Sequence, residues 1–397
     1  PVLHCVDGAK FGEVNRGFGT LALILILFAA GLELDLRNSL KQFGAGTALA
    51  LISYALAFAG AAYFCIYALR LAMMPSLLVA ATLACMSGSI VLPVLEQLEM
   101  RQTVRTTLVI EASFGDGLGA LGVGVLIDLA RGGAEIKSGP LADLFSRVGL
   151  APGSHGSVTG AVTAIVLYKF VIALAVAFVA AYAWLRLLPI ISDKAFWQVL
   201  TFAAVLLLFA GIHAVGGSPL FGVMAFGAAL ANLPDPRNSA DSFVFRILPP
   251  DPSKAIHSFH AELAFLVRSF FFVLLGVLVD FRGLRKEILA SLGIVSVLFI
   301  ARFVAVQISR VGWRGTTARE REVATLLIPR GLITAVLALD AVRAMPDQLA
   351  FLTPLAFAVI LLTNILVLLA AVRAKDMILE TAAEPAAALP SSEATPA

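Results

Sequence analysis

Two acidic residues lie close together in an apolar segment over residues 105–129. Glu111 precedes Asp116 by five residues, and Asp116 is flanked by Gly115 and Gly117. A charge inside a bilayer costs about 2.5–3.5 kcal/mol on insertion scales, so a charge that is retained there marks a functional site. Five helical residues turn by about 500°, so the two carboxylates point about 140° apart and separate roles are expected. The alternative is that Asp116 lies near a helix end that water reaches.

The preceding apolar segment, 75–98, is interrupted by polar and helix-breaking residues. Ser87, Gly88 and Ser89 stand in its middle, and Pro93 follows them. Irregular backbone at membrane depth is tolerated only when it is buried in protein or lines a wet cavity. The interruption would free carbonyl groups and offer hydroxyl groups to a small cation near Asp116. The alternative is a kink that merely packs against a neighbouring helix.

A second interruption lies in the segment 321–343, where Pro329 and Gly331 flank Arg330. Proline removes a helical hydrogen bond and clashes with the preceding turn. One interrupted helix in each half of a transporter indicates an inverted repeat with its site at the crossing. We expect Arg330 to neutralise the partial negative charge at the C-terminal end of a half-helix.

Three further cations lie within apolar segments. Arg302 is in mid-span and needs a carboxylate partner; Glu111 is the best candidate, which leaves Asp116 free to titrate. The alternative for Arg302 is that its side chain snorkels to the membrane surface, which is the interpretation we favour for Lys169 and Arg268.

The composition requires a membrane protein. Of the 397 residues, 60% are hydrophobic and 14% are charged, against about 45–50% and 25% in soluble domains. This excludes a cytosolic enzyme and a secreted disulfide scaffold, and a net charge of +3 excludes a nucleic-acid binder. The three cysteines and five histidines form no metal-binding pattern, and we expect no cofactor.

The apolar segments predict an all-α polytopic protein. Eleven are long enough, or nearly long enough, to span a bilayer: 17–34, 44–69, 75–98, 105–129, 158–188, 194–215, 217–233, 261–280, 287–309, 321–343 and 349–373. We expect one transmembrane domain over residues 1–375 and a short disordered tail over 376–397. The tail is expected to be cytoplasmic, because the loops on its side carry the larger share of the 29 lysines and arginines.

Together these motifs resemble the monovalent cation:proton antiporter superfamily, the sodium/proton exchangers and their bacterial relatives. The resemblance rests on LILFAAGLELDL at 25–36, SIVLPVLEQ at 89–97, EASFGDGLG at 111–119, ARFVAVQIS at 301–309 and PRGLITAVLAL at 329–339. It implies an inverted-repeat fold with two crossing broken helices, a homodimer, and a bacterial inner membrane. It also implies thirteen spans, so we expect two helices to be missing before Pro1.

The resemblance also assigns roles to residues. Asp116 matches the residue that binds the ion and the proton, and Ser87 falls where relatives carry Asp or Ser in their first broken helix. We expect Ser87, Ser89 and Ser113 to contribute to the ion-binding and proton-binding site. Glu111 and Arg302 match a buttressing acid–arginine pair. Gly88, Pro93, Pro329, Arg330 and Gly331 form the crossing.

The chain departs from the family pattern at two places. Gly115 precedes Asp116, where relatives have Asn or Asp, and Met86-Ser87-Gly88 replaces Thr-Asp-Pro. One ion-binding carboxylate therefore remains, for which Na⁺ or K⁺ competes with H⁺. By resemblance, this single carboxylate and an arginine rather than a lysine at position 302 imply electroneutral exchange. We expect the exchange to proceed by alternating access of an elevator-like core.

Three other functions fit the sequence less well. An intramembrane aspartyl protease needs two aspartates that share a proton, and no second mid-span aspartate is present. A channel needs no pair of broken helices around one acid. A sodium-coupled solute symporter of similar fold is the main alternative, although polar residues for an organic substrate are sparse.

Overall fold

The structure is a computed structural model that describes residues 8–34, 40–98, 100–131, 158–191, 196–232, 259–260, 262–270, 273, 281–309 and 316–383. Within these ranges the chain is helical and contains no strand, so the prediction of an all-α protein is confirmed. The main helices are α1 (Gly8–Leu32), α2 (Leu40–Tyr67), α3 (Met73–Ala84), α4 (Gly88–Gln97), α5 (Gln102–Ala130), α7 (Val158–Ile191), α8 (Trp197–Ala214), α9 (Pro219–Ala231), α11 (Phe281–Ile308), α12 (Ala318–Leu326), α13 (Leu332–Ala344), α14 (Pro346–Leu349) and α15 (Leu352–Ala383).

Long apolar stretches account for most of these helices. In the described part of the chain, seven helical stretches are long and apolar enough to cross a membrane. They are Gln42–Tyr67, Met73–Leu95, Gln102–Ala130, Ile165–Leu187, Trp197–Ala214, Glu287–Ile308 and Leu352–Arg373.

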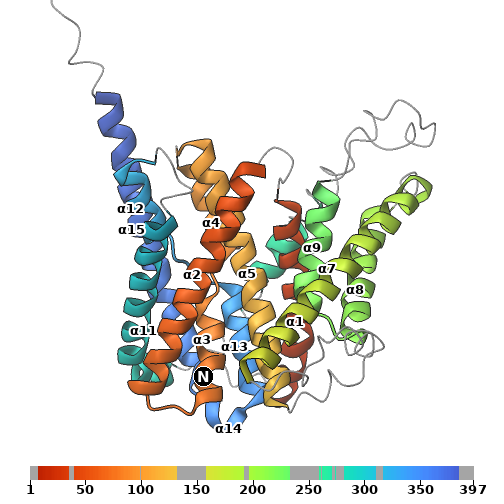
Figure 1. Ribbon diagram of the computed structural model, residues 1–397, viewed down its shortest axis with the longest axis horizontal. Helices are drawn as coiled ribbons and strands as arrows, with labels where there is room; N and C mark the ends of the chain where they lie inside the picture. Colours follow the sequence, from red (N-terminus) through yellow and green to blue (C-terminus); the bar gives the residue numbers. More distant parts are fainter. Residues whose placement is uncertain are drawn as a thin grey trace, which may run out of the picture.

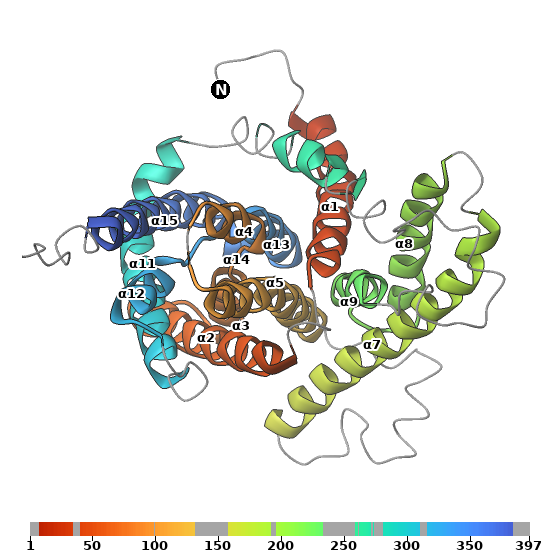
Figure 2. The same ribbon diagram turned by 90° about the horizontal axis from the view of Figure 1, so that it is seen from above.

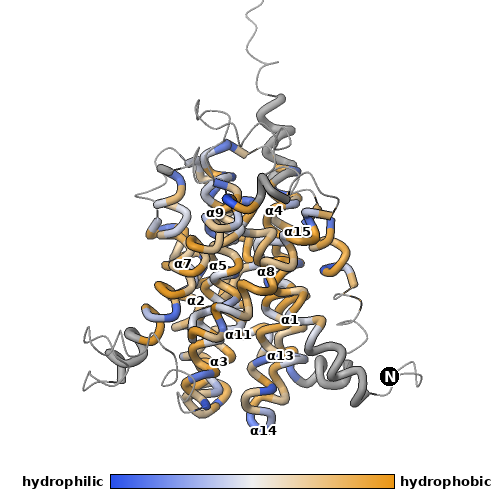
Figure 3. Tube along the Cα trace, turned by 90° about the vertical axis from the view of Figure 1, so that its right-hand side faces the viewer, coloured by the Kyte–Doolittle hydropathy of each residue, from blue (hydrophilic) through white to orange (hydrophobic). Residues whose placement is uncertain are grey.

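Each of these stretches matches one of the predicted spans. The predicted spans 17–34 and 217–233 contain the shorter apolar helices Gly17–Leu32 and Pro219–Ala231. The span predicted over 261–280 lies partly outside the described residues. Figure 3 shows hydrophobic residues along most of the height of the helices.

The helices form two groups, which Figures 1 and 2 show from the side and from above. The core bundle consists of α2 to α5 and α11 to α15. The side bundle consists of α1 and α7 to α9, in which α9 packs against the other three helices. Figure 1 also separates two faces of the molecule: α12 lies at one end of the helices and α14 at the other. We call these the α12 face and the α14 face.

Both predicted interruptions are present. Residues 85–87 separate α3 from α4, and residues 327–331 separate α12 from α13. The sequence-based assignment of Pro93 to the first interruption is wrong, because Pro93 lies inside α4. A proline in a helix removes only the hydrogen bond to the carbonyl four residues earlier, and here another donor satisfies that carbonyl, as described below.

The C-terminal boundary differs from the predicted one. Helix α15 continues to Ala383, beyond the position at which a tail is predicted to begin. The remainder of the predicted tail, 384–397, lies outside the described residues.

Candidate functional site

The two interrupted helices meet through their non-helical segments. The backbone N–H of Ser87 donates to the carbonyl of Pro329 at 2.9 Å. A Cβ atom placed on Gly331 would collide with the side chain of Ser87. The two breaks are therefore in direct backbone contact, and the chain has glycine where the approach is closest.

Asp116 lies beside this crossing. It is fully buried, and its Oδ2 accepts a hydrogen bond of 3.0 Å from the backbone N–H of Gly88, the first residue of α4. The N-terminus of a helix offers free N–H groups and a partial positive charge, which together stabilise an anion. A Cβ atom on Gly88 would lie 3.2 Å from Oδ2, so a larger residue would crowd this contact.

Asp116 also presents an oxygen that has no hydrogen-bond partner. Among the described residues, neither Oδ1 of Asp116 nor the buried hydroxyl of Ser113 has a partner. The two residues are three apart on α5, so their side chains are neighbours on one helix face. Buried polar atoms are nearly always satisfied, and this pair of oxygens is chemically suited to a small cation or a proton.

Ser87 and Ser89 flank Gly88 in the sequence, at the junction between the first interruption and α4. Their hydroxyl groups are 3.0 Å apart and hydrogen-bonded to each other, and Ser87 is buried. The predicted hydroxyls therefore lie at the start of α4, next to the residue that binds Asp116.

Arg330, from the second interruption, binds the C-terminal end of α3. Its Nε donates to the carbonyl of Leu83 at 2.6 Å, in the last turn of α3, and its Nη1 donates to the carbonyl of Ile328 at 3.2 Å. Its backbone is bound by Thr363 and Asn364 of α15, at 3.1 and 3.2 Å. Because the carbonyls at a helix C-terminus carry partial negative charge, the buried guanidinium neutralises this end of α3.

Glu111 does not share the ion site with Asp116. Its carboxylate forms an ion pair with Nη1 of Arg302, and both side chains are almost completely buried. Ser53 donates to Glu111 at 2.9 Å, and Nε of Arg302 donates to the carbonyl of Ala324 at 2.9 Å. The pair thus connects α5 and α11 to the end of α12 and engages Oε1 of Glu111, whereas Oε2 has no hydrogen-bond partner among the described residues.

Sequence reasoning missed the position of Arg268. Instead of snorkelling away, its guanidinium donates to the carbonyl of Ser89 at 3.3 Å. This is the carbonyl that the missing N–H of Pro93 would have bound in a regular helix. Arg268 also interacts electrostatically with Asp116 and Glu33. The signal in the sequence was Pro93 itself, since it leaves one carbonyl near the site without a helical donor.

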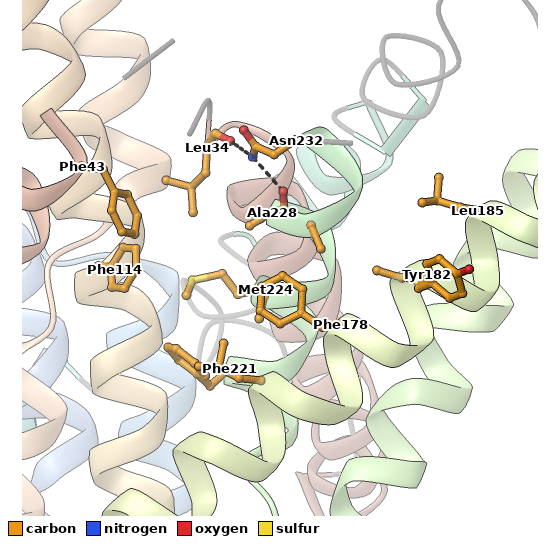
Figure 4. Close-up of a pocket in the computed structure, with 14 residues that line it drawn as sticks. Leu34, Phe43, Phe114, Phe178, Tyr182, Leu185, Phe221, Met224, Ala228 and Asn232 are labelled. Carbon is orange, nitrogen blue, oxygen red and sulfur yellow. Dashed lines mark hydrogen bonds between the residues drawn. The ribbon is translucent and has the colours of Figure 1, made fainter. Parts of the chain in front are cut away.

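An apolar cavity of about 370 Å³ separates α5 from α7 and α9 on the side of Asp116 that faces the α12 face. Figure 4 shows Phe114 on one wall and Phe178, Phe221 and Met224 on the other. At its end Asn232 donates to the carbonyl of Leu34 at 2.5 Å.

A second, more polar cavity of about 460 Å³ lies toward the α14 face. It begins one turn beyond Asp116, at Ala120, and reaches Arg131 and Asp340. Asp116 is not among the lining residues of either cavity. The buried carboxylate therefore lies between two cavities, each on the side of a different face.

No group of three or more metal-ligating side chains occurs among the described residues. The oxygens around Asp116 are suited to a cation that passes through the site as substrate.

Comparison with known proteins agrees with this arrangement. The model of the family described as "Sodium/hydrogen exchanger, transmembrane" matches residues 6–372. No curated protein matches the chain. Two solved structures of the sodium proton antiporter MjNhaP1 from Methanocaldococcus jannaschii are similar at 20% identity. The structure at pH 8 has a TM-score of 0.71 over 94% of this chain and 88% of that one. The electron-microscopy structure has a TM-score of 0.61 over 100% of this chain and 90% of that one. These likenesses establish the fold.

Proposed function

This chain belongs to the sodium/hydrogen exchanger family, and from that premise we propose that it exchanges one monovalent cation, Na⁺ or K⁺, for one H⁺ at Asp116. It is a secondary transporter and not an enzyme. The observation that carries the proposal is the placement of Asp116: it is fully buried, hydrogen-bonded to the start of α4 through one oxygen, and without a partner for the other among the described residues.

Competition for one carboxylate is sufficient to couple the two fluxes. Oδ1 of Asp116 either carries a proton or binds a cation, and it cannot do both. The hydroxyls of Ser113, Ser87 and Ser89 and the backbone carbonyls of residues 85–87 are proposed as the further ligands. Freed carbonyls at a broken helix are suitable ligands for such an ion.

The loaded site carries the same charge with either substrate. The carboxylate of Glu111 is neutralised by Arg302, which leaves Asp116 as the exchanging acid. A proton and a monovalent cation each add one positive charge, so the exchange is electroneutral, with one cation moved for each proton. An empty, negatively charged Asp116 would have to cross a low-dielectric region, which is costly. That cost suppresses uncoupled return of the empty site.

Alternating access is proposed to occur between the core bundle and the side bundle. Asp116 lies on α5 of the core bundle, and the two cavities lie on either side of it between the bundles. Displacement of the core bundle would connect the site to one cavity and then to the other. We propose that the α12 face is cytoplasmic, that the membrane is a bacterial inner membrane, and that the protein acts as a homodimer.

The test is cation-driven proton movement in proteoliposomes. A preset pH gradient should be dissipated by Na⁺ or by K⁺ in the parent protein and not in the Asp116→Asn variant. The matched control is Asp347→Asn, at an exposed position on α14, which should retain full activity. Equal rates in the parent and Asp116→Asn would refute the proposed site. Gradient dissipation that required an added organic solute would instead favour a symporter.

A further inference from the structure

A second buried ion pair joins the two bundles. Nζ of Lys169 on α7 donates to Oδ2 of Asp128 on α5, and both residues are more than nine-tenths buried. The sequence predicted that Lys169 would snorkel. Its ammonium group instead ends on a carboxylate of the core bundle.

Asp128 belongs to the helix that carries the ion site. It follows Asp116 by twelve residues, or about 18 Å along α5. Any movement of α5 that displaces Asp116 as a rigid body therefore displaces Asp128 as well.

Lys169 is fixed to the side bundle. The carbonyl of Lys169 accepts a hydrogen bond of 3.3 Å from the N–H of Ser218, and the hydroxyl of the neighbouring Tyr168 donates to the carbonyl of Val215 at 3.1 Å. These contacts attach this turn of α7 to the connection between α8 and α9. The ion pair consequently spans the boundary across which the two bundles would have to move.

The surroundings of the pair also differ from those of a structural ion pair in a dry core. It lines the polar cavity near the α14 face, where Asp128, Arg131 and Asp340 come from the core bundle and Lys169 and His213 from the side bundle. Charges that separate into a polar cavity can regain hydration, so the pair can open at a far lower cost than one that separates in hydrocarbon. On the other side of Asp116, the cavity between α5 and α7 is apolar.

We propose that Asp128 and Lys169 form a latch that holds α5 against α7 near the α14 face, and that this latch opens when Asp116 becomes accessible from that face. The proposal rests on alternating access as proposed above, and it assigns positioning roles to both residues. The latch would bias the protein toward the state in which this side of the site is closed.

The test measures accessibility and does not depend on transport. A cysteine is introduced at Leu121, a buried position on α5 that lines the polar cavity. Its labelling by a membrane-impermeant maleimide added at the α14 face is timed, after subtraction of the labelling of the parent protein. Asp128→Asn or Lys169→Met should each accelerate labelling about tenfold, as expected for a shift in a two-state population. The charge-reversed double variant, Asp128→Lys with Lys169→Asp, should restore slow labelling.

The matched control is the ion pair between Arg101 and Glu320, which lies within the core bundle. Glu320→Gln removes an ion pair that is more exposed than the latch and does not cross the boundary, and it should leave the labelling rate at Leu121→Cys unchanged. Unchanged labelling in both single latch variants, with cooperative thermal unfolding retained, would overturn the proposal. Equally fast labelling in the charge-reversed variant would also overturn it, because loss of packing would then explain the single variants. If the parent protein did not exchange cations for protons but labelling still responded as described, the proposed function would fail while the latch would stand.

Discussion

The N–H of Ser87 donates to the carbonyl of Pro329 across the two interrupted helices, at 2.9 Å. A single main-chain hydrogen bond thus joins two segments that are far apart in the sequence, immediately beside the residue that binds Asp116. The first interruption contributes an N–H from its non-helical residues 85–87, and the second contributes a carbonyl from its non-helical residues 327–331. The ion site is therefore supported by backbone from both halves of the chain.

This close approach makes Gly331 sensitive to a single methyl group. Gly331→Ala should lower stability by about 1–3 kcal/mol, in the range of overpacked cores, because its Cβ atom would overlap the side chain of Ser87. The same displacement should reduce exchange. Thermal unfolding in detergent and antiport in proteoliposomes would measure the two effects. Gly124→Ala is the matched control, since a Cβ atom at Gly124 meets nothing within 4 Å. It should be neutral or slightly stabilising.

The Glu111–Arg302 pair should be much more important for stability than an exposed pair. Removing one partner of a buried ion pair costs about 3–5 kcal/mol, because the other charge is left buried. Glu111→Gln and Arg302→Met should each be destabilising by this amount, and the double variant should be destabilised by less than the sum. Arg343→Met, which breaks a pair with Asp340 at 3.0 Å whose side chains are 31% and 34% exposed, should cost at most about 1 kcal/mol. A double variant that showed simple additivity would argue against direct coupling.

Much of the ion site was predictable from the sequence, because a membrane restricts which residues can lie inside apolar segments. Charges and helix-breaking residues inside apolar segments are costly, so Asp116, Arg302 and Arg330 could be singled out by position alone. The partner of Arg302 could be inferred by the same reasoning, since its charge needed a carboxylate within the membrane.

The parts that could not be predicted depend on which helices are neighbours in space. Arg268 and Lys169 are one or two turns inside their segments, where snorkelling is as reasonable as pairing. Only the packing of α7 against α5 identifies Asp128 as the partner of Lys169. Pro93 could not be separated from the true interruption for a similar reason, because its effect depends on whether another donor reaches the carbonyl of Ser89.

Arg268 should influence the affinity for the transported cation. Its positive charge interacts with Asp116, and a like charge near a bound cation weakens binding. Arg268→Gln should therefore lower the apparent KM for the cation several-fold at alkaline pH, where competition from protons is weakest. Cation-dependent transport rates in proteoliposomes would measure this. Arg186→Gln, at an exposed position near the end of α7, should leave the KM unchanged. An unchanged KM in Arg268→Gln would show that Arg268 has only a structural role.

The ion pair between Arg101 and Glu320 should make stability depend on pH. Glu320 precedes the span predicted over 321–343. Hydrogen bonds from the Arg101 side chain are the main cause of its lowered pKa. Hydrogen bonds from Thr317 lower the pKa further, and together they outweigh burial, which raises it. A lowered pKa in the folded state means that the carboxylate stabilises the protein at pH values above its unfolded pKa, about 4.3. This contribution is lost as the pH falls through the lower, folded value. Because the side chain of Arg101 is half exposed, the contribution should be about 1 kcal/mol. Unfolding in detergent should show this difference between the parent and Glu320→Gln at pH 7, and the difference should disappear at pH values below the folded pKa. A difference that persisted unchanged in acid would contradict an ionic origin.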